Sequence, residues 1–247
     1  MISIDYSILY HSPSYVSIDR ITIAILFFNR ETKETRLICT KNWKRVSSFN
    51  DDLDIDLIKL QLEGINEEIQ EIAKAPNFSL EKYTKFYINE LKFTEVITNE
   101  AENFSDFIEE CKRQFIPQDF EKSKRPSRDE QVKFIKKYLK TSNIECKPST
   151  IKGYFNENVN FDFIIGDYAF RIFRFEGRKE SRLISTVKDW AYNAIKLKDK
   201  YKIIFITDKD FTEPENYKIL YDILGEDATI ISYNQAMEYI KKLINNI

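Results

Sequence analysis

The stretch that decides the fold of the second half of the chain runs from Asn160 to Gly177. It reads Asn-Phe-Asp-Phe-Ile-Ile-Gly-Asp-Tyr-Ala-Phe-Arg-Ile-Phe-Arg-Phe-Glu-Gly. Aromatic and β-branched residues flank Gly166-Asp167 on both sides, a pattern typical of a β-hairpin with a two-residue turn. A segment with helical periodicity, 181–197, and an apolar strand, 202–207, follow. This half is therefore expected to build a sheet that opens with a hairpin.

The rest of the chain predicts an α/β fold with two different halves. Strand-like runs at Ser3–His11, Ile18–Phe28 and Thr35–Thr40 predict an antiparallel meander. Helices at about 51–74, 80–91 and 105–115, with a short strand at 93–98, follow the meander. Beyond residue 126, strands alternate with helices, which predicts a mixed, partly parallel sheet. The elements expected there are helices at 127–140, 181–197, 213–224 and 234–244 and strands at 150–155, 202–207 and 228–233.

The polar stretch from Pro117 to Pro126 is the best boundary between the two halves. Ser127 and Glu130 then have the spacing of a capping box, which marks the start of a helix. We therefore expect a domain at 1–116 with an antiparallel sheet and acidic helices, a linker at 117–126, and an α/β domain at 127–247.

Composition excludes several kinds of chemistry. The single histidine, His11, rules out a Ser-His-Asp or Cys-His arrangement elsewhere in the chain and a cluster of histidine metal ligands. His11 stands beside Ser12-Pro13 at a strand end, where a hydrogen-bonded structural role is expected. With five glycines, no phosphate-binding loop or dinucleotide fingerprint can be written on the chain. NTP hydrolysis and nicotinamide chemistry are not expected.

Cysteine usage and hydropathy indicate a cytoplasmic protein without a membrane segment. Cys39, Cys111 and Cys146 are odd in number, and no two have the spacing of metal ligands, so free thiols in a reducing compartment are expected. The longest apolar run, Ile21–Phe28, is far shorter than the roughly 18 residues of a membrane span. No signal-peptide pattern is present at the N-terminus.

Charge is unevenly distributed although the net charge is only −2. Residues 50–110 carry 16 acidic and 5 basic side chains, a net of −11, whereas residues 111–153 carry 12 basic and 5 acidic ones, a net of +7. The basic residues predict a surface for nucleic acid or for an acidic protein face, including that of a second copy in a homo-oligomer. The alternative is that the two blocks face each other or are ordinary solvated faces. The candidate binding residues are Lys133, Lys136, Lys137, Lys140, Arg171, Arg174, Arg178 and Arg182.

Most Tyr and Phe residues fall at the spacing of strand or helix cores, so the sequence shows no platform on which bases could stack.

The hairpin in this half resembles a degenerate restriction-endonuclease-like core. That frame implies carboxylates holding Mg²⁺ and a lysine that orients water or stabilises charge. The residues that could fill these roles are Asp162, Asp167, Glu176 and Lys179. Arg178 stands where the family has lysine. Pairing across Gly166-Asp167 would place Asp162 opposite Arg171, which favours a cross-strand ion pair instead.

Three further stretches resemble small uncharacterised bacterial and prophage proteins: Tyr6-Ser-Ile-Leu-Tyr10, Ile18–Phe27 and Asn160–Ile165. That resemblance implies a mobile-element setting, such as antiviral defence or a phage counter-measure, and brings no catalytic residues. Three functions are therefore open. The preferred one is a non-catalytic interaction protein that needs no cofactor, because binding needs only a surface. The alternatives are a Mg²⁺-dependent nuclease and a toxin–antitoxin or regulatory partner.

Overall fold

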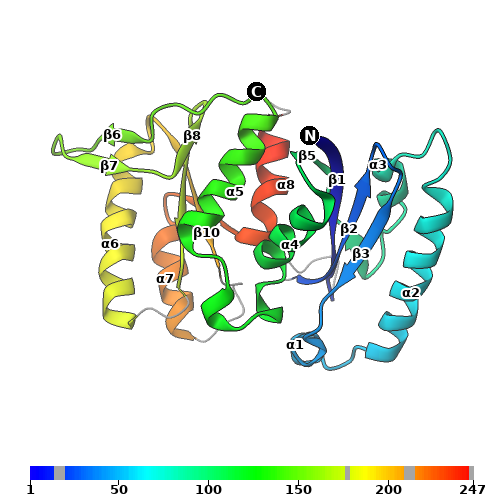
Figure 1. Cartoon of the computed structure of the whole chain (residues 1–247). Coiled ribbons are helices and arrows are strands. Elements are labelled where there is room, and N and C mark those ends of the chain that lie inside the picture. The colour runs from blue at the N-terminus through cyan, green and yellow to red at the C-terminus, as the bar shows by residue number, and fades with distance from the viewer. Residues whose placement is uncertain (14–19, 176–178, 209–214, 245–247) are drawn as a thin grey trace. The chain divides into compact units, whose positions relative to one another are not determined.

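The computed structural model describes residues 1–13, 20–175, 179–208 and 215–244, and the chain divides into two units, Met1–Pro126 and Ser127–Ile247 (Figure 1). The expected α/β fold is confirmed. The strands of the first unit form one antiparallel sheet, while those of the second form a four-stranded sheet and a separate ribbon. Residues 117–126 belong to the first unit, so the chain divides at the end of the expected linker.

The first unit is built on the expected antiparallel meander. Its strands are β1 (Ile2–His11), β2 (Ile21–Asn29), β3 (Thr35–Cys39), β4 (Leu91–Phe93) and β5 (Ile97–Ala101). The order is β3-β2-β1-β4, and β5 also pairs with β1. Every residue of β2 is buried, because this strand is central and α2 and α4 cover the two faces of the sheet (Figure 1).

The helices of the first unit differ from the sequence expectation at several ends. They are α1 (Trp43–Phe49), α2 (Ile55–Ile72), α3 (Leu80–Thr84) and α4 (Phe104–Phe115), followed by the 3₁₀ turns η1 (Pro117–Asp119) and η2 (Lys122–Lys124). The sequence reading missed α1. Asp54 caps α2, which begins four residues later than expected, and Asn103 caps α4, which begins one residue earlier. The predicted helix at 80–91 is wrong after Thr84, because Leu91 pairs with His11 in the sheet.

The second unit has the mixed sheet that the hairpin predicts. Its sheet contains β8 (Phe163–Ile165), β9 (Tyr168–Phe173), β10 (Lys202–Thr207) and β11 (Thr229–Ser232), in the order β11-β10-β9-β8. β9, β10 and β11 run parallel, and β8 is antiparallel to β9. The turn has the expected register, with Ile165 opposite Tyr168, and Gly166 adopts a φ of 55°, which suits glycine.

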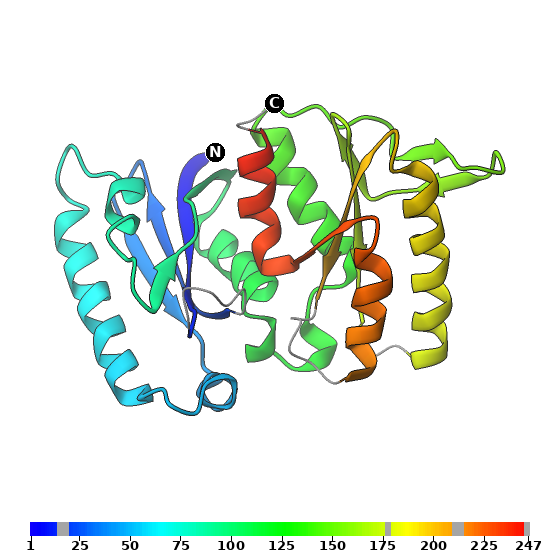
Figure 2. The ribbon, with the colours of Figure 1, turned by 180° about the vertical axis from the view of Figure 1, so that it is seen from behind.

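Helices cover both faces of this sheet. They are α5 (Arg128–Thr141), α6 (Glu180–Leu197), α7 (Glu215–Gly225) and α8 (Tyr233–Ile244). Figure 1 and Figure 2 show α6 and α7 along one face of the sheet and α5 and α8 along the other. A separate two-stranded ribbon, β6 (Thr150–Lys152) and β7 (Asn158–Asn160), lies where a single strand at 150–155 was expected. In the part of the chain that is described, no helix is both long and apolar enough to cross a membrane.

Candidate functional site

Asp162, the first candidate metal ligand, is held by a network within the second unit. Its side chain is only 6% exposed. Arg128 Nη2 donates to Asp162 Oδ1, Arg171 Nη1 lies 3.7 Å from the same oxygen, and the Ile172 amide donates to Oδ2 at 2.7 Å. The expected pairing of Asp162 with Arg171 is therefore present, with Arg128 as a second partner that the sequence did not reveal. Both carboxylate oxygens have donors inside the protein.

The other nuclease candidates do not gather around Asp162. Asp167 lies in the hairpin turn, at the opposite end of β8 from Asp162, and Lys147 Nζ is 3.5 Å from it. Lys179 is exposed at the start of α6. Glu176 and Arg178 lie outside the described residues. Within the described residues, no group of three or more His, Cys, Asp or Glu side chains is placed to hold a metal ion.

Sequence reasoning missed one carboxylate in this region, Asp208. It directly follows β10, at the edge where the parallel strands end. Asp208 Oδ1 accepts a hydrogen bond of 2.8 Å from the Phe175 amide, and Oδ2 lies 3.9 Å from Arg174 Nε. The signal was available, since polar residues after parallel strands collect at one edge of a sheet.

The candidate basic residues are divided between two faces of the second unit. Lys133, Lys136, Lys137 and Lys140 are all exposed on α5. Arg182 is exposed on α6, which covers the other face of the sheet (Figure 1). Arg171 and Arg174 are partly buried beside Asp162 and Asp208. The α5 lysines therefore form a surface of their own, and Arg178 lies outside the described residues.

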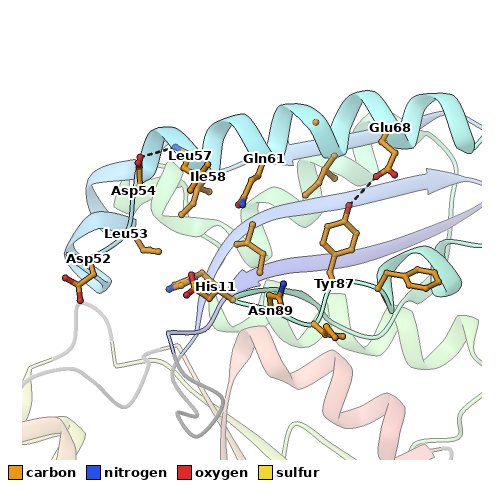
Figure 3. A pocket seen from close by; sticks show the side chains of 16 residues that line it. His11, Asp52, Leu53, Asp54, Leu57, Ile58, Gln61, Glu68, Tyr87 and Asn89 are labelled. Carbon is orange, nitrogen blue, oxygen red and sulfur yellow. Dashed lines mark hydrogen bonds between the residues drawn. The ribbon is translucent and has the colours of Figure 1, made fainter.

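The first unit contains a cleft, which we call the α2 cleft (Figure 3). Its volume is about 970 Å³. Its wall on one side is α2, and on the other it is the segment 86–91 that leads into β4, with His11 at the end of β1 between them. The lining residues are His11, Asp52, Leu53, Asp54, Leu57, Ile58, Gln61, Gly64, Ile65, Glu68, Phe86, Tyr87, Ile88, Asn89, Glu90 and Leu91.

The rim of the α2 cleft exposes large apolar side chains. Phe86 is 82% exposed, Ile88 66% and Leu57 51%. A second hollow of about 490 Å³ shares Glu68, Phe86 and Tyr87 with the α2 cleft, so the two form neighbouring parts of one groove along α2. Clustered apolar exposure of this kind marks a contact surface more often than scattered single residues do.

The same cleft is acidic. Its described lining contains four carboxylates, from Asp52, Asp54, Glu68 and Glu90, and no lysine or arginine. Asp54 Oδ1 accepts from the amides of Asp56 and Leu57 and so also caps α2. A positively charged ligand would meet these carboxylates here, and the adjoining hollow adds one lysine, Lys82.

Two tyrosines fix the position of Glu68. Tyr83 Oη donates to Glu68 Oε2 at 2.9 Å. Tyr87 Oη lies 3.4 Å from the same oxygen (Figure 3). Burial raises the pKa of Tyr83, and the hydrogen bonds to Tyr87 and Glu68 raise it further. Burial is also the main reason that the pKa of Tyr87 is raised. Both phenols therefore stay protonated and hold the carboxylate at the junction of the two hollows.

Gly64 leaves room in the wall of the cleft. A Cβ atom at this position would meet no atom within 4 Å. Glycine in an exposed helix interior costs about 0.5–1 kcal/mol relative to alanine. No backbone requirement explains Gly64, since its φ lies outside the left-handed region. Because Gly64 has no side chain, this part of α2 leaves open space beside the cleft.

His11 closes the inner end of the α2 cleft. It is 1% exposed, its Nε2 lies 3.3 Å from Asn50 Nδ2, and its ring packs edge-on against Phe49. Nδ1 is buried, and none of the described residues meets hydrogen-bond geometry with it. Burial lowers the pKa of His11, and Glu90, through its carboxylate and its backbone, opposes this in part. The ring is therefore neutral at pH 7.

A pH dependence of stability follows from His11. Because the unfolded chain binds a proton at higher pH than the folded protein does, the free energy of unfolding should fall as the pH drops below about 6.5. Above about pH 6.5, the contribution of the neutral His11 ring to the free energy of unfolding is fully present. In a His11→Gln variant, the slope of unfolding free energy against pH between about 6.5 and 5 should be smaller. Urea unfolding across this range measures both slopes, and equal slopes would show that His11 does not resist protonation.

Comparison of the chain with protein-family models, with curated proteins and with solved structures finds no match.

Proposed function

We propose that this is a non-catalytic interaction protein whose first unit binds a segment of a partner protein in the α2 cleft. The observation that carries the proposal is the exposure of Phe86 and Ile88 beside a cleft with four carboxylates and no described basic residue. The segment that fits carries apolar side chains for the rim and lysine or arginine for the carboxylates. A mobile-element setting remains a proposal from the sequence resemblance.

Hydrophobic burial supplies a reason for binding. Covering apolar surface contributes roughly 25 cal/mol per Å², and aromatic anchors such as Phe86 commonly carry much of an interface's energy. The groove follows a helix of 18 residues, and a partner helix laid along it would place side chains at helical spacing. The carboxylates would mainly select a basic partner and speed its association.

The arrangement around Asp162 supports binding over nuclease chemistry. A catalytic carboxylate must offer an oxygen to a metal or to water, whereas both oxygens of Asp162 already accept from Arg128 and Ile172 within the protein. The other candidates that the structure describes, Asp167 and Lys179, lie away from it at the turn of the hairpin and at the start of α6.

A pair of designed peptides tests the proposal. The first is an amphipathic helix of leucine and lysine with a fluorescent label, and the second replaces each lysine with glutamate. The wild-type protein should bind only the basic peptide, as measured by fluorescence anisotropy. A Phe86→Ser/Ile88→Ser variant should lose at least tenfold in affinity, because both side chains contact solvent and can be removed without opening the core. Equal binding of the two peptides, or full affinity in the variant, would refute the assignment.

A second candidate surface is the α5 helix with its exposed Lys133, Lys136, Lys137 and Lys140. Its charge suits nucleic acid or an acidic protein face, including the acidic first unit of another copy.

A double charge reversal should weaken binding at this surface. Lys136→Glu/Lys137→Glu is expected to lower affinity for a DNA duplex by about tenfold at low salt and to flatten the dependence on salt, because fewer counterions are released. Titrations at several salt concentrations measure both effects, and sedimentation reports any change in oligomeric state. If the affinity for DNA and its dependence on salt concentration were both unchanged in the variant, α5 would not be a binding surface.

A further inference from the structure

A cluster of exposed aromatic rings lies on the second unit, between the β6–β7 ribbon and α6. The ribbon lies beside the C-terminal half of α6 (Figures 1 and 2). Tyr154 and Phe155 occupy the tip of the ribbon and are 66% and 73% exposed. Tyr192 of α6 is also exposed. We call these three rings the aromatic platform. Sequence patterns did not predict this platform, because the ring of α6 and those of the ribbon are far apart in the chain.

The rings of the platform are ordered with respect to one another. Phe155 and Tyr192 are parallel within 5°, with ring centroids 6.0 Å apart, and Tyr154 meets Phe155 edge-on at 5.3 Å. Exposure of this much aromatic surface is unfavourable in water unless a partner covers it.

The turn that carries Tyr154 and Phe155 is tightly built. The Gly153 amide donates to the Glu157 carbonyl at 2.9 Å, and the Phe155 amide donates to Glu157 Oε2 at 2.7 Å. A Cβ on Gly153 would lie 2.1 Å from Glu157 Oε1, so a larger residue there would displace the Glu157 side chain from the turn. The two rings are therefore held outward by the backbone. The Glu157 carboxylate accepts one of these hydrogen bonds and so places one acidic group in the turn.

Positive charge accompanies the rings. Lys196 Nζ lies 4.6 Å from the centroid of Tyr154 and 5.7 Å from that of Tyr192. Lys188 is exposed one helical turn before Tyr192 and so lies on the same side of α6. Lys152 of the ribbon donates to the Asn156 carbonyl at 3.2 Å. Asp189 is exposed three residues before Tyr192 and so adds one carboxylate to the same side of α6, while Asp199 lies beyond the end of the helix.

From this geometry we propose that the aromatic platform binds single-stranded nucleic acid. Flat exposed rings can stack on bases without regard to sequence. Lys196, which lies over the Tyr154 and Tyr192 rings, and the nearby Lys188 would neutralise phosphates between those bases. A paired duplex hides the faces of its bases, so a single strand suits the platform better. This site is separate from the α2 cleft in both residues and unit, and it does not depend on the proposed function of that cleft.

The test uses the full chain and labelled oligonucleotides of about 15 nucleotides, the upper range for one small binding fold. The probes are single-stranded thymidine and uridine oligomers and a DNA duplex, at low salt. The wild-type protein should bind both single strands more tightly than the duplex. A Tyr154→Ala/Phe155→Ala variant, which retains every charge, should bind the single strands at least tenfold more weakly and the duplex unchanged.

Two further variants test the contribution of charge to oligonucleotide binding and show whether the α2 cleft takes part in it. Lys196→Gln should reduce the slope of log affinity against log salt by about 0.7. Phe86→Ala removes an equally exposed ring from the first unit and should leave oligonucleotide affinity unchanged. Equal single-strand affinity in the wild type and the Tyr154→Ala/Phe155→Ala variant, or loss of single-strand binding in Phe86→Ala, would overturn the proposal.

Discussion

Replacing Asp162 with alanine is expected to lower the free energy of unfolding by about 3–5 kcal/mol, the cost of breaking a buried ion pair by removing one partner. The carboxylate is 6% exposed, and the Arg128 and Arg171 side chains are each less than a quarter exposed. Without Asp162, two guanidinium groups would face each other without the charge between them, and the Ile172 amide would lose its acceptor. The thermal midpoint should fall by on the order of 10 °C.

The matched control is Asp167→Ala, five residues away in the same hairpin. Asp167 is exposed, and its 3.5 Å pair with Lys147 is open to water, so its loss should change stability by less than about 0.5 kcal/mol. Chemical unfolding of both variants makes the comparison. Similar stabilities would contradict the structural role of Asp162. A nuclease assay on Asp162→Ala must therefore include a measurement of folding, since unfolding alone would abolish activity.

Asp119→Ala should lower the free energy of unfolding by about 2 kcal/mol, because a charged acceptor with several donors is lost. Asp119 Oδ1 accepts from Thr40 Oγ1 at 2.7 Å, and Oδ2 accepts from the Lys41 amide at 2.7 Å. The Asn42 amide also donates to Oδ1 at 3.2 Å. Asp119 thereby fixes the turn between β3 and α1, in which Asn42 caps α1.

The control for Asp119 is Glu121→Ala, two residues along. Glu121 is exposed and lies 3.6 Å from the exposed Lys124, so its removal should be nearly neutral. Thermal unfolding, with circular dichroism as the signal, distinguishes the two. If Asp119→Ala were as stable as Glu121→Ala, residues 117–119 would be the passive linker that the sequence indicates.

These two carboxylates show what the sequence could and could not reveal. Strand periodicity and the Gly166-Asp167 turn predicted the hairpin and its register, because both depend on residues close in the chain. The pairing of Asp162 with Arg171 followed from that register. The contribution of Arg128, 34 residues before Asp162, depends on how α5 packs, and no local pattern records it. The role of Asp119 could not be predicted from the sequence either, because its hydrogen-bond partners are more than 75 residues away in the chain.

The two candidate sites also depend on contacts between residues that are far apart in the chain. The acidic block 50–110 was visible in the sequence, but the α2 cleft requires α3 to end at Thr84 so that Phe86 and Ile88 reach the rim. Helical periodicity continues past Thr84, and the pairing of β4 with β1 overrides it. The aromatic platform likewise combines a ribbon tip with a helix 37 residues further on.

The central claim is that the α2 cleft binds a basic, apolar segment, and a substitution at Gly64 tests it most directly. Gly64→Ala and Gly64→Trp both replace a helical glycine that has open space around its Cβ position, so both should fold and be at least as stable as the wild type. Only the tryptophan side chain is large enough to project into the cleft. Anisotropy with the leucine–lysine peptide should give wild-type affinity for Gly64→Ala and at least a tenfold loss for Gly64→Trp. Equal affinity in the two variants, both folded, would contradict the claim.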